Sequence, residues 1–179
     1  MKTVLFFITI IFIQILSCTN TSESKEIEVK FNIQDQYSNN PKYELIFSSG
    51  GQVIARRTFE KGKIIFEEGE IPDGQVIEKY DNGNIRNLFS YKKGKRNGKA
   101  FSFYENGRLK MEGTYLENNP IGITKMYYEN GNLMMESKIK DGKNIYYKEY
   151  YENGQMKQEV YYEGDEIRRK MYNINGQIE

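Results

Sequence analysis

Between residues 74 and 179 the chain repeats one short pattern of apolar, polar and turn residues. In each period an aromatic pair precedes a polar turn that contains glycine, and alternating apolar and polar residues follow the turn. Alternation with a period of two is typical of a half-buried β-strand. The segment after one such turn therefore predicts that Leu109, Met111 and Tyr115 share one face of a strand, with the residues between them on the other face.

The turns recur at a nearly constant interval. Each unit has an aspartate or glutamate and an asparagine before its glycine, except the last, and the glycines are 22 to 24 residues apart: Gly83, Gly107, Gly131, Gly154 and Gly176. A second turn follows 10 or 11 residues later, at Gly94, Asn118, Gly142 and Gly164. Asparagine followed by glycine favours a two-residue hairpin turn, because both residues reach positive φ at low cost. Each period is thus predicted to be two strands and two turns, stacked in an array.

Aromatic pairs occupy equivalent places before the turns. Because adjacent strand residues face opposite ways, each pair is expected to place one ring on each side of the sheet. The two predicted ladders are Tyr80, Tyr104, Tyr128 and Tyr151 on one side and Phe103, Tyr127, Tyr150 and Tyr172 on the other. Contacts between aromatic residues on neighbouring strands stabilise a sheet.

The chain before residue 74 divides into three predicted parts. Residues 1–17 resemble an export signal, and residues 18–41 contain a polar tether and one alternating strand from Ile27 to Ile33. Residues 42–73 keep the 11-residue spacing of turns and are interpreted as a degenerate leading unit with an insertion. With the array at 74–179, the fold class predicted is all-β: an elongated, single-layer antiparallel sheet of stacked hairpins of about 23 residues each.

The first residues also predict where the protein is located. Lys2 and the apolar run from Val4 to Leu16 precede the sequence Leu-Ser-Cys, and Cys18 is the single cysteine of the chain. This arrangement resembles a bacterial lipoprotein signal, in which cleavage before the cysteine leaves its thiol for lipid attachment. The alternative is an ordinary secreted chain with one free thiol. We expect an exported lipoprotein anchored in a bacterial membrane, on the periplasmic or cell-surface side.

Composition excludes several classes of function. The chain has no histidine, which removes the commonest general base near neutral pH and the usual metal ligand. Lys2 is one of 26 basic residues, so the predicted mature chain has 25 basic against 25 acidic residues. A net charge of zero gives no general attraction to nucleic acid. No catalytic residue, cofactor or metal site is predicted, and no pair of carboxylates is singled out by its spacing.

The repeated motif resembles the bacterial variant of the membrane occupation and recognition nexus (MORN) repeat. Residues 104–112, Tyr-Glu-Asn-Gly-Arg-Leu-Lys-Met-Glu, carry the pattern best, and residues 151–159 carry it with Met156 in place of leucine. The unit at Tyr80 departs from it at two positions, with Asp81 and Leu88 in place of glutamates. The resemblance implies an elongated, twisted, single-layer sheet. Bacterial members of the family are often described as antitoxin-like, and eukaryotic members are associated with scaffolding.

Two polar clusters are weaker candidates for a site. The cluster from Lys92 to Lys99 carries five basic residues at a turn and could contact phosphate, but a solvated hairpin tip explains it more simply. Glu105, Glu129 and Glu152 are expected to follow one another along the array. Calcium needs six or more converging oxygens, and a row of single carboxylates does not converge.

The aromatic ladders are the main candidate for partner binding. Tyrosine is favoured at interfaces, although packing within the sheet is the alternative role. We therefore expect a non-enzymatic protein whose partner-binding residues are the eight of the two ladders. The bound molecule is either a protein scaffold partner, a toxin neutralised by an antitoxin-like protein, or a cell-wall glycan or lipid headgroup. The last unit is also expected to leave an open sheet edge, to which a partner or a second copy could add a strand.

Overall fold

A computed structural model describes residues 26–33 and 42–179, and every regular element in those ranges is a β-strand. The strands are β1 (Ile27–Ile33), β2 (Tyr43–Ser49), β3 (Gln52–Glu60), β4 (Lys63–Gly69), β5 (Gly74–Lys79), β6 (Ile85–Lys92), β7 (Lys95–Phe103), β8 (Leu109–Leu116), β9 (Asn119–Tyr127), β10 (Leu133–Lys140), β11 (Lys143–Tyr150), β12 (Met156–Glu163) and β13 (Glu166–Met171). They form one sheet. The predicted all-β, single-layer fold is confirmed, while the predicted signal, Cys18 and the tether up to residue 25 lie outside the described residues.

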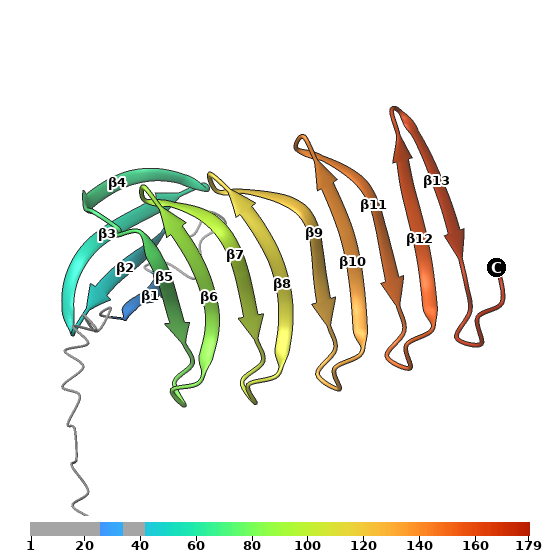
Figure 1. Cartoon of the computed structure of the whole chain (residues 1–179), viewed down its shortest axis with the longest axis horizontal. Coiled ribbons are helices and arrows are strands. Elements are labelled where there is room, and N and C mark those ends of the chain that lie inside the picture. Colours follow the sequence, from blue (N-terminus) through green and yellow to red (C-terminus); the bar gives the residue numbers. More distant parts are fainter. Residues whose placement is uncertain (1–25, 34–41) are drawn as a thin grey trace, which may run out of the picture.

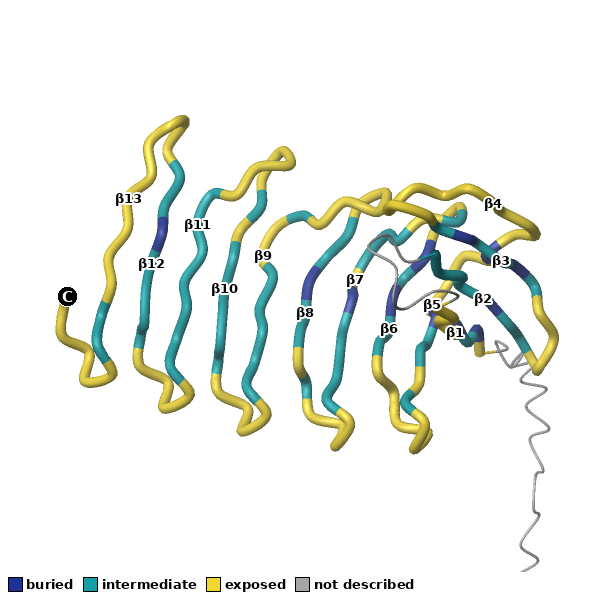
Figure 2. The backbone as a smooth tube through the Cα atoms, turned by 180° about the vertical axis from the view of Figure 1, so that it is seen from behind, coloured by how far each residue is buried: buried dark blue, intermediate teal, exposed yellow. Residues whose placement is uncertain are grey.

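From β5 to β13 the strands follow one another in sequence order, each antiparallel to the next (Figure 1). Each strand contacts only its two neighbours, as in other repeat architectures. From β8 onwards no strand contributes a residue to the central buried cluster of the described chain. Side chains of adjacent units instead cover one another, and more than half of the strand residues there are half-buried (Figure 2).

The N-terminal strands join the array out of sequence order. β1 lies beside β5 and runs parallel to it, pairing Ile27 with Val76 and Glu28 with Ile77, and β2, β3 and β4 follow on its other side. Lys79 of β5 also binds Glu26 and Glu28, at 2.7 Å from each carboxylate. The strands of residues 42–73 are thus in the same sheet as the array, but they connect to it through β1.

The sheet curls at this end around a small apolar core. Figure 1 shows β1 to β4 turning out of line with the later strands. Phe47 of β2 and Val76 of β5 are fully buried, and the Phe47 ring meets the Tyr91 ring edge-on, with centroids 5.9 Å apart. Arg57 of β3 donates to the Gly94 carbonyl at 2.6 Å, which links the leading strands to the tip of the β6–β7 hairpin. The buried cluster comprises Ile27, Val29, Phe47, Ala55, Ile71, Val76, Phe89, Tyr91 and Ala100.

The glycine turns differ from the predicted type. In the turn at Tyr104, the Gly107 amide donates to the Tyr104 carbonyl at 2.9 Å and the Tyr104 amide donates to the Arg108 carbonyl at 2.8 Å. Only Gly107 has positive φ, at 84°, so this is a three-residue loop and the prediction of a two-residue turn is wrong. The Asn106 side chain accepts from the Arg108 amide, which explains the asparagine.

Two-residue turns with positive φ lie at the opposite ends of the hairpins. Lys93–Gly94, Glu117–Asn118 and Asp141–Gly142 have φ between 49° and 72° at both residues. The extra residue in each glycine turn also produces a bulge. Leu109 pairs with Phe103 but Met111 pairs with Ser102, so Leu109 and Met111 lie on opposite faces and the prediction that they share one is wrong.

Tyrosines at the glycine turns connect each unit to the next. The hydroxyl of the tyrosine that opens a turn donates to a main-chain carbonyl of the following unit at 2.7 to 2.9 Å: Tyr80 to Phe103, Tyr104 to Tyr127, Tyr128 to Tyr150 and Tyr151 to Tyr172. Beside each bond, the turn asparagine reaches the next turn as well; Asn130 donates to the Glu152 carbonyl at 3.1 Å. These bonds keep successive units in register.

The interunit bond predicts the effect of removing one hydroxyl. Tyr104→Phe leaves the Tyr127 carbonyl without its donor, and we expect the free energy of unfolding to fall by about 1 kcal/mol. Tyr162→Phe is the control, since the Tyr162 hydroxyl has no hydrogen-bond partner in the described part of the chain. Equilibrium denaturation of both variants measures the difference, and equal losses would contradict the linking role.

The turn geometry predicts the response to replacement of Gly107. A Cβ at this position meets nothing within 4 Å, so any cost comes from the positive φ alone. We expect Gly107→Ala to lower the free energy of unfolding by roughly 1–2 kcal/mol. Gly107→Asn should cost less, because asparagine tolerates the left-handed region better than alanine. Denaturation curves of the two variants provide the comparison, and an alanine variant as stable as the wild type would contradict it.

Candidate functional site

The array presents two faces with different chemistry. We call the face that carries the buried cluster the inner face. Ala100 of that cluster pairs with Gly113 on β8, and Met111 is two residues from Gly113, so Met111 is also on the inner face. The outer face is the opposite one and carries Phe103 and Glu112.

Aromatic residues form one row on the outer face. The row consists of the second predicted ladder: Phe103, Tyr127, Tyr150 and Tyr172, each at the end of a strand or just beyond it. All four side chains are half-buried. The strands between these rings place apolar residues on the same face: Leu109 pairs with Phe103, Leu133 with Tyr127 and Met156 with Tyr150. The outer face thus carries a continuous apolar and aromatic stripe near the glycine turns.

A row of alternating charges runs beside the aromatic row. Each member is directly opposite the next on the neighbouring strand: Glu112, Lys125, Glu136, Lys148, Glu159 and Lys170. The ammonium of Lys125 is 3.9 Å from the Glu136 carboxylate, and that of Lys170 is 3.5 Å from Glu159. Opposite charges on neighbouring strands stabilise their register. The row was not predicted, because it becomes visible only when strands from different units are aligned.

Tyrosine hydroxyls connect the two rows. Tyr127 donates to Glu112 at 2.7 Å and Tyr172 donates to Glu159 at 3.0 Å, while Tyr146 donates to Glu136 at 2.8 Å from the far side of the charge row. Burial, reinforced by the acceptor carboxylate, raises the pKa of Tyr127 to about 12. The same causes raise the pKa of Tyr146 to about 12. These rings are held with the hydroxyl directed into the charge row.

The first predicted ladder has a different role. The hydroxyls of Tyr80, Tyr104, Tyr128 and Tyr151 are used in the interunit bonds described above. The cation of Arg86 lies over the Tyr80 ring at 5.5 Å from its centroid, and Lys110 lies over Tyr104 at 5.3 Å. This geometry gives the first ladder a structural task, whereas the second ladder lies on an open face of the sheet.

The inner face of the array carries methionines. Met111, Met126 and Met135 lie opposite one another on β8, β9 and β10 and are half-buried. Further along the same row, Gln158 donates to Glu149. Methionine is flexible and adapts to irregular contacts, so this face could also accept a partner. Sequence alternation could have revealed these methionines, but the bulges obscure which strand residues are neighbours.

Some of the weaker candidates make contacts within the protein. In the basic cluster, Lys95 is 3.3 Å from Glu117, and Arg96 lies 3.9 Å above the Phe89 ring. Glu129 accepts from Asn106 at 2.8 Å. Within residues 26–33 and 42–179, no three potential ligands gather where they could hold a metal ion. In the same ranges, no helix has the length and apolar character that a membrane crossing requires.

The raised tyrosine pKa values predict a pH dependence. A phenol whose pKa rises from 10 to about 12 on folding stabilises the protein fully below pH 10, and this stabilisation is lost as the pH rises through 12. We expect phenolate absorbance to show late-titrating groups whose amplitude falls in Tyr127→Phe, with Tyr146 still titrating late. Titration of all tyrosines near pH 10 in the folded protein would contradict the prediction.

Comparison with known proteins agrees with the geometry of the repeat. The model of the MORN repeat variant family matches residues 72–93, 96–117, 120–141 and 143–163. A search of the curated proteins found no match. Each matched stretch covers two strands and the glycine turn between them, and the four follow one another along the sheet from β5 to β12. The chain is therefore a MORN-repeat protein, with four variant repeats between residues 72 and 163.

Proposed function

We propose that this protein is a membrane-anchored, non-enzymatic scaffold that binds another protein on the outer face of its repeat array. MORN repeats are in general motifs of protein and membrane interaction, and their all-β fold is not a known enzyme family. The observation that carries the proposal is the pair of rows on the outer face. An aromatic stripe beside alternating charges offers apolar contact area together with oriented polar groups, the combination found at protein interfaces.

Hollows beside the charge row support the choice of this face. One hollow of about 310 Å³ lies across β12 and β13, and its lining includes Glu159, Tyr161 and Arg168. A second, of about 200 Å³, is lined in part by Glu112, Ile123 and Lys125. Both are shallow depressions in which side chains of a partner could lie. Their walls carry both signs of charge, which favours a protein surface over a uniformly anionic lipid surface.

Anchoring is part of the proposal and has a separate basis. The sequence before residue 26 resembles a lipoprotein signal ending at Cys18, which would place the array outside the cytoplasm. Two or three acyl chains would hold it stably at a membrane. An antitoxin-like role is the special case in which the bound protein is a toxin. Glycan or lipid headgroup binding through the tyrosines is the remaining alternative.

The proposal predicts that one face of β11 determines binding. Tyr150 lies on the outer face, and Tyr147 on the same strand lies on the inner face. We expect Tyr150→Ala to lose a stoichiometric protein that copurifies with the crosslinked wild-type protein from its own cells, and Tyr147→Ala to retain it. The reason is that only Tyr150 contributes apolar area to the outer row.

Both variants must first be shown to fold and to fractionate with membranes like the wild type. Loss of the partner in Tyr147→Ala alone would move the site to the inner face. No copurifying protein with the wild type would overturn the proposal and favour glycan or lipid. If the partner is a toxin, cells that lack this protein should die when the partner is expressed.

A further inference from the structure

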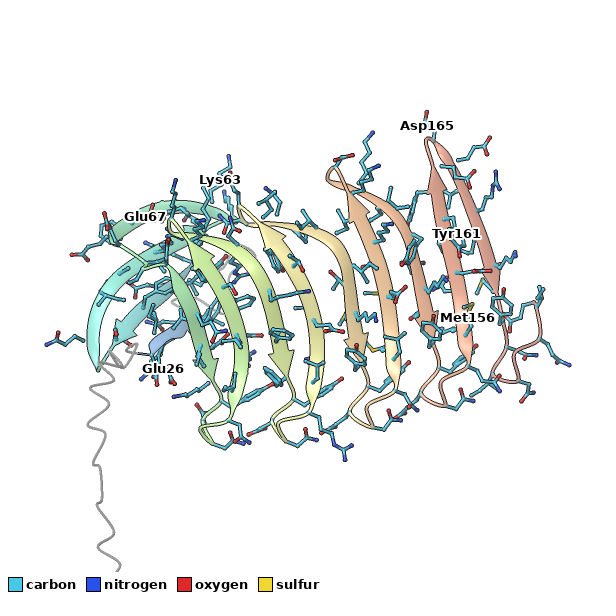
Figure 3. The ribbon with its side chains drawn as sticks, viewed as in Figure 1. Glu26, Lys63, Glu67, Met156, Tyr161 and Asp165 are labelled. Atoms are coloured by element: carbon cyan, nitrogen blue, oxygen red, sulfur yellow. The ribbon has the colours of Figure 1, made fainter. Side chains whose placement is uncertain are left out.

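Each of the glycine turns contains an asparagine directly before its glycine: Asn82, Asn106, Asn130, Asn153 and Asn175. Asparagine before glycine is prone to spontaneous deamidation, because glycine has no side chain to shield its amide nitrogen. All five asparagines are exposed, and Figure 3 shows these turns side by side along the edge of the array near Met156. Access to solvent therefore does not distinguish one asparagine from another.

The chemistry of deamidation makes it sensitive to the way a carboxamide is held. The glycine amide nitrogen attacks the side-chain carbonyl carbon of the asparagine, a bond forms between these two atoms, and the carboxamide nitrogen leaves as ammonia. Water then opens the resulting succinimide ring at either carbonyl and gives aspartate or isoaspartate. Hydrogen bonds that hold the carboxamide away from the glycine nitrogen have to break before the attack, so they slow the reaction.

Four of the five carboxamides are held by two hydrogen bonds each. The oxygen accepts from the main-chain amide two residues later at 2.8 to 3.0 Å. The nitrogen donates to an oxygen of the next turn at 2.8 to 3.4 Å. Asn106, for example, accepts from Arg108 and donates to the carboxylate of Glu129. The held residues are Asn82, Asn106, Asn130 and Asn153.

The fifth carboxamide, that of Asn175, lacks both bonds. In its turn the Gln177 amide donates to the side chain of Asn173 at 3.0 Å instead. The Asn175 side chain takes part in no hydrogen bond within the described part of the chain. The main-chain bonds of this turn match those of the others, since the Gly176 amide donates to the Asn173 carbonyl at 2.8 Å. The difference between the turns therefore lies in the carboxamide.

A sixth pair of this kind, Asn97–Gly98, lies inside β7 rather than in a turn. The Asn97 carboxamide also has no hydrogen bond to any described residue, but Asn97 is half-buried and Gly98 pairs with Tyr115 on β8. Formation of the ring would require this paired main chain to leave the sheet. We therefore expect Asn97 to react slowly as well.

We propose that Asn175 is a modification site at which the folded protein deamidates, while the structure protects the other asparagine–glycine pairs of the described chain. This proposal is independent of the partner on the outer face. Isoaspartate carries one additional atom in the main chain, and Asn175 lies between residues that pair with each other. Ile178 pairs with Tyr172, and the Glu179 amide donates to the Met171 carbonyl at 3.0 Å. A longer turn would disturb this pairing and uncover the edge of β13.

The test follows each asparagine in the full chain, solubilised in a mild detergent and incubated at mildly alkaline pH. Peptide mass spectrometry measures the conversion at each position. We expect Asn175 to react about ten times faster than the four held asparagines or more, as the absence of two hydrogen bonds implies. In urea, all five should react at similar rates, because each precedes glycine. Equal rates in the folded protein would overturn the proposal.

Glu129 offers a matched pair of variants that tests the cause. Glu129→Ala removes the oxygen to which Asn106 donates, whereas Glu129→Gln keeps an oxygen at this place. Asn106 should react about five times faster in Glu129→Ala and at the wild-type rate in Glu129→Gln, with Asn130 unaffected in both. An unchanged rate at Asn106 in Glu129→Ala would show that these bonds do not protect the turns, and the proposal would fail.

Discussion

The hydrogen bond from a turn tyrosine to a carbonyl of the next unit is the interaction on which the array depends. Neighbouring strands would pair without it, but main-chain hydrogen bonds alone can form in more than one register, so side chains have to select one. The tyrosine hydroxyl has one acceptor in the following unit, at the residue before the next turn tyrosine. Each unit thereby sets the register of the next, and the charge row and aromatic row can align only because this register is kept.

Much of the fold could be predicted from the sequence. The strands of the array follow from apolar alternation, and the spacing of Gly83, Gly107 and Gly131 reveals the period. The turn type could not be read from asparagine and glycine alone, since this pair is favoured in two-residue turns but stands in three-residue loops here. Each three-residue loop is followed by a bulge, in which one strand has an extra residue. Residues beyond the bulge therefore lie on the opposite face from the one predicted.

The site was predictable only in part, for a related reason. The eight aromatic positions were identified, but their division into interunit links and an outer row depends on where each hydroxyl finds an acceptor. The charge row joins residues such as Glu112 and Lys125 that belong to different repeats, so no local pattern marks it. The pairing of β1 with β5 could not be predicted for the same reason, because nothing in either segment specifies a partner more than 40 residues away.

The short parallel pairing of β1 with β5 has a mechanical consequence. A load that reaches the sheet at residue 26 enters through an interior strand, between the leading strands and the array. β1 shares seven residue pairs with β2 but two with β5, so the two sides resist the load unequally. Under tension the β1–β5 seam would open first. The Arg57 hydrogen bond and the buried cluster both cross the β1–β5 pairing, so they would be lost when it breaks. The N-terminal strands would then separate from the repeat array, whose own strands would stay paired.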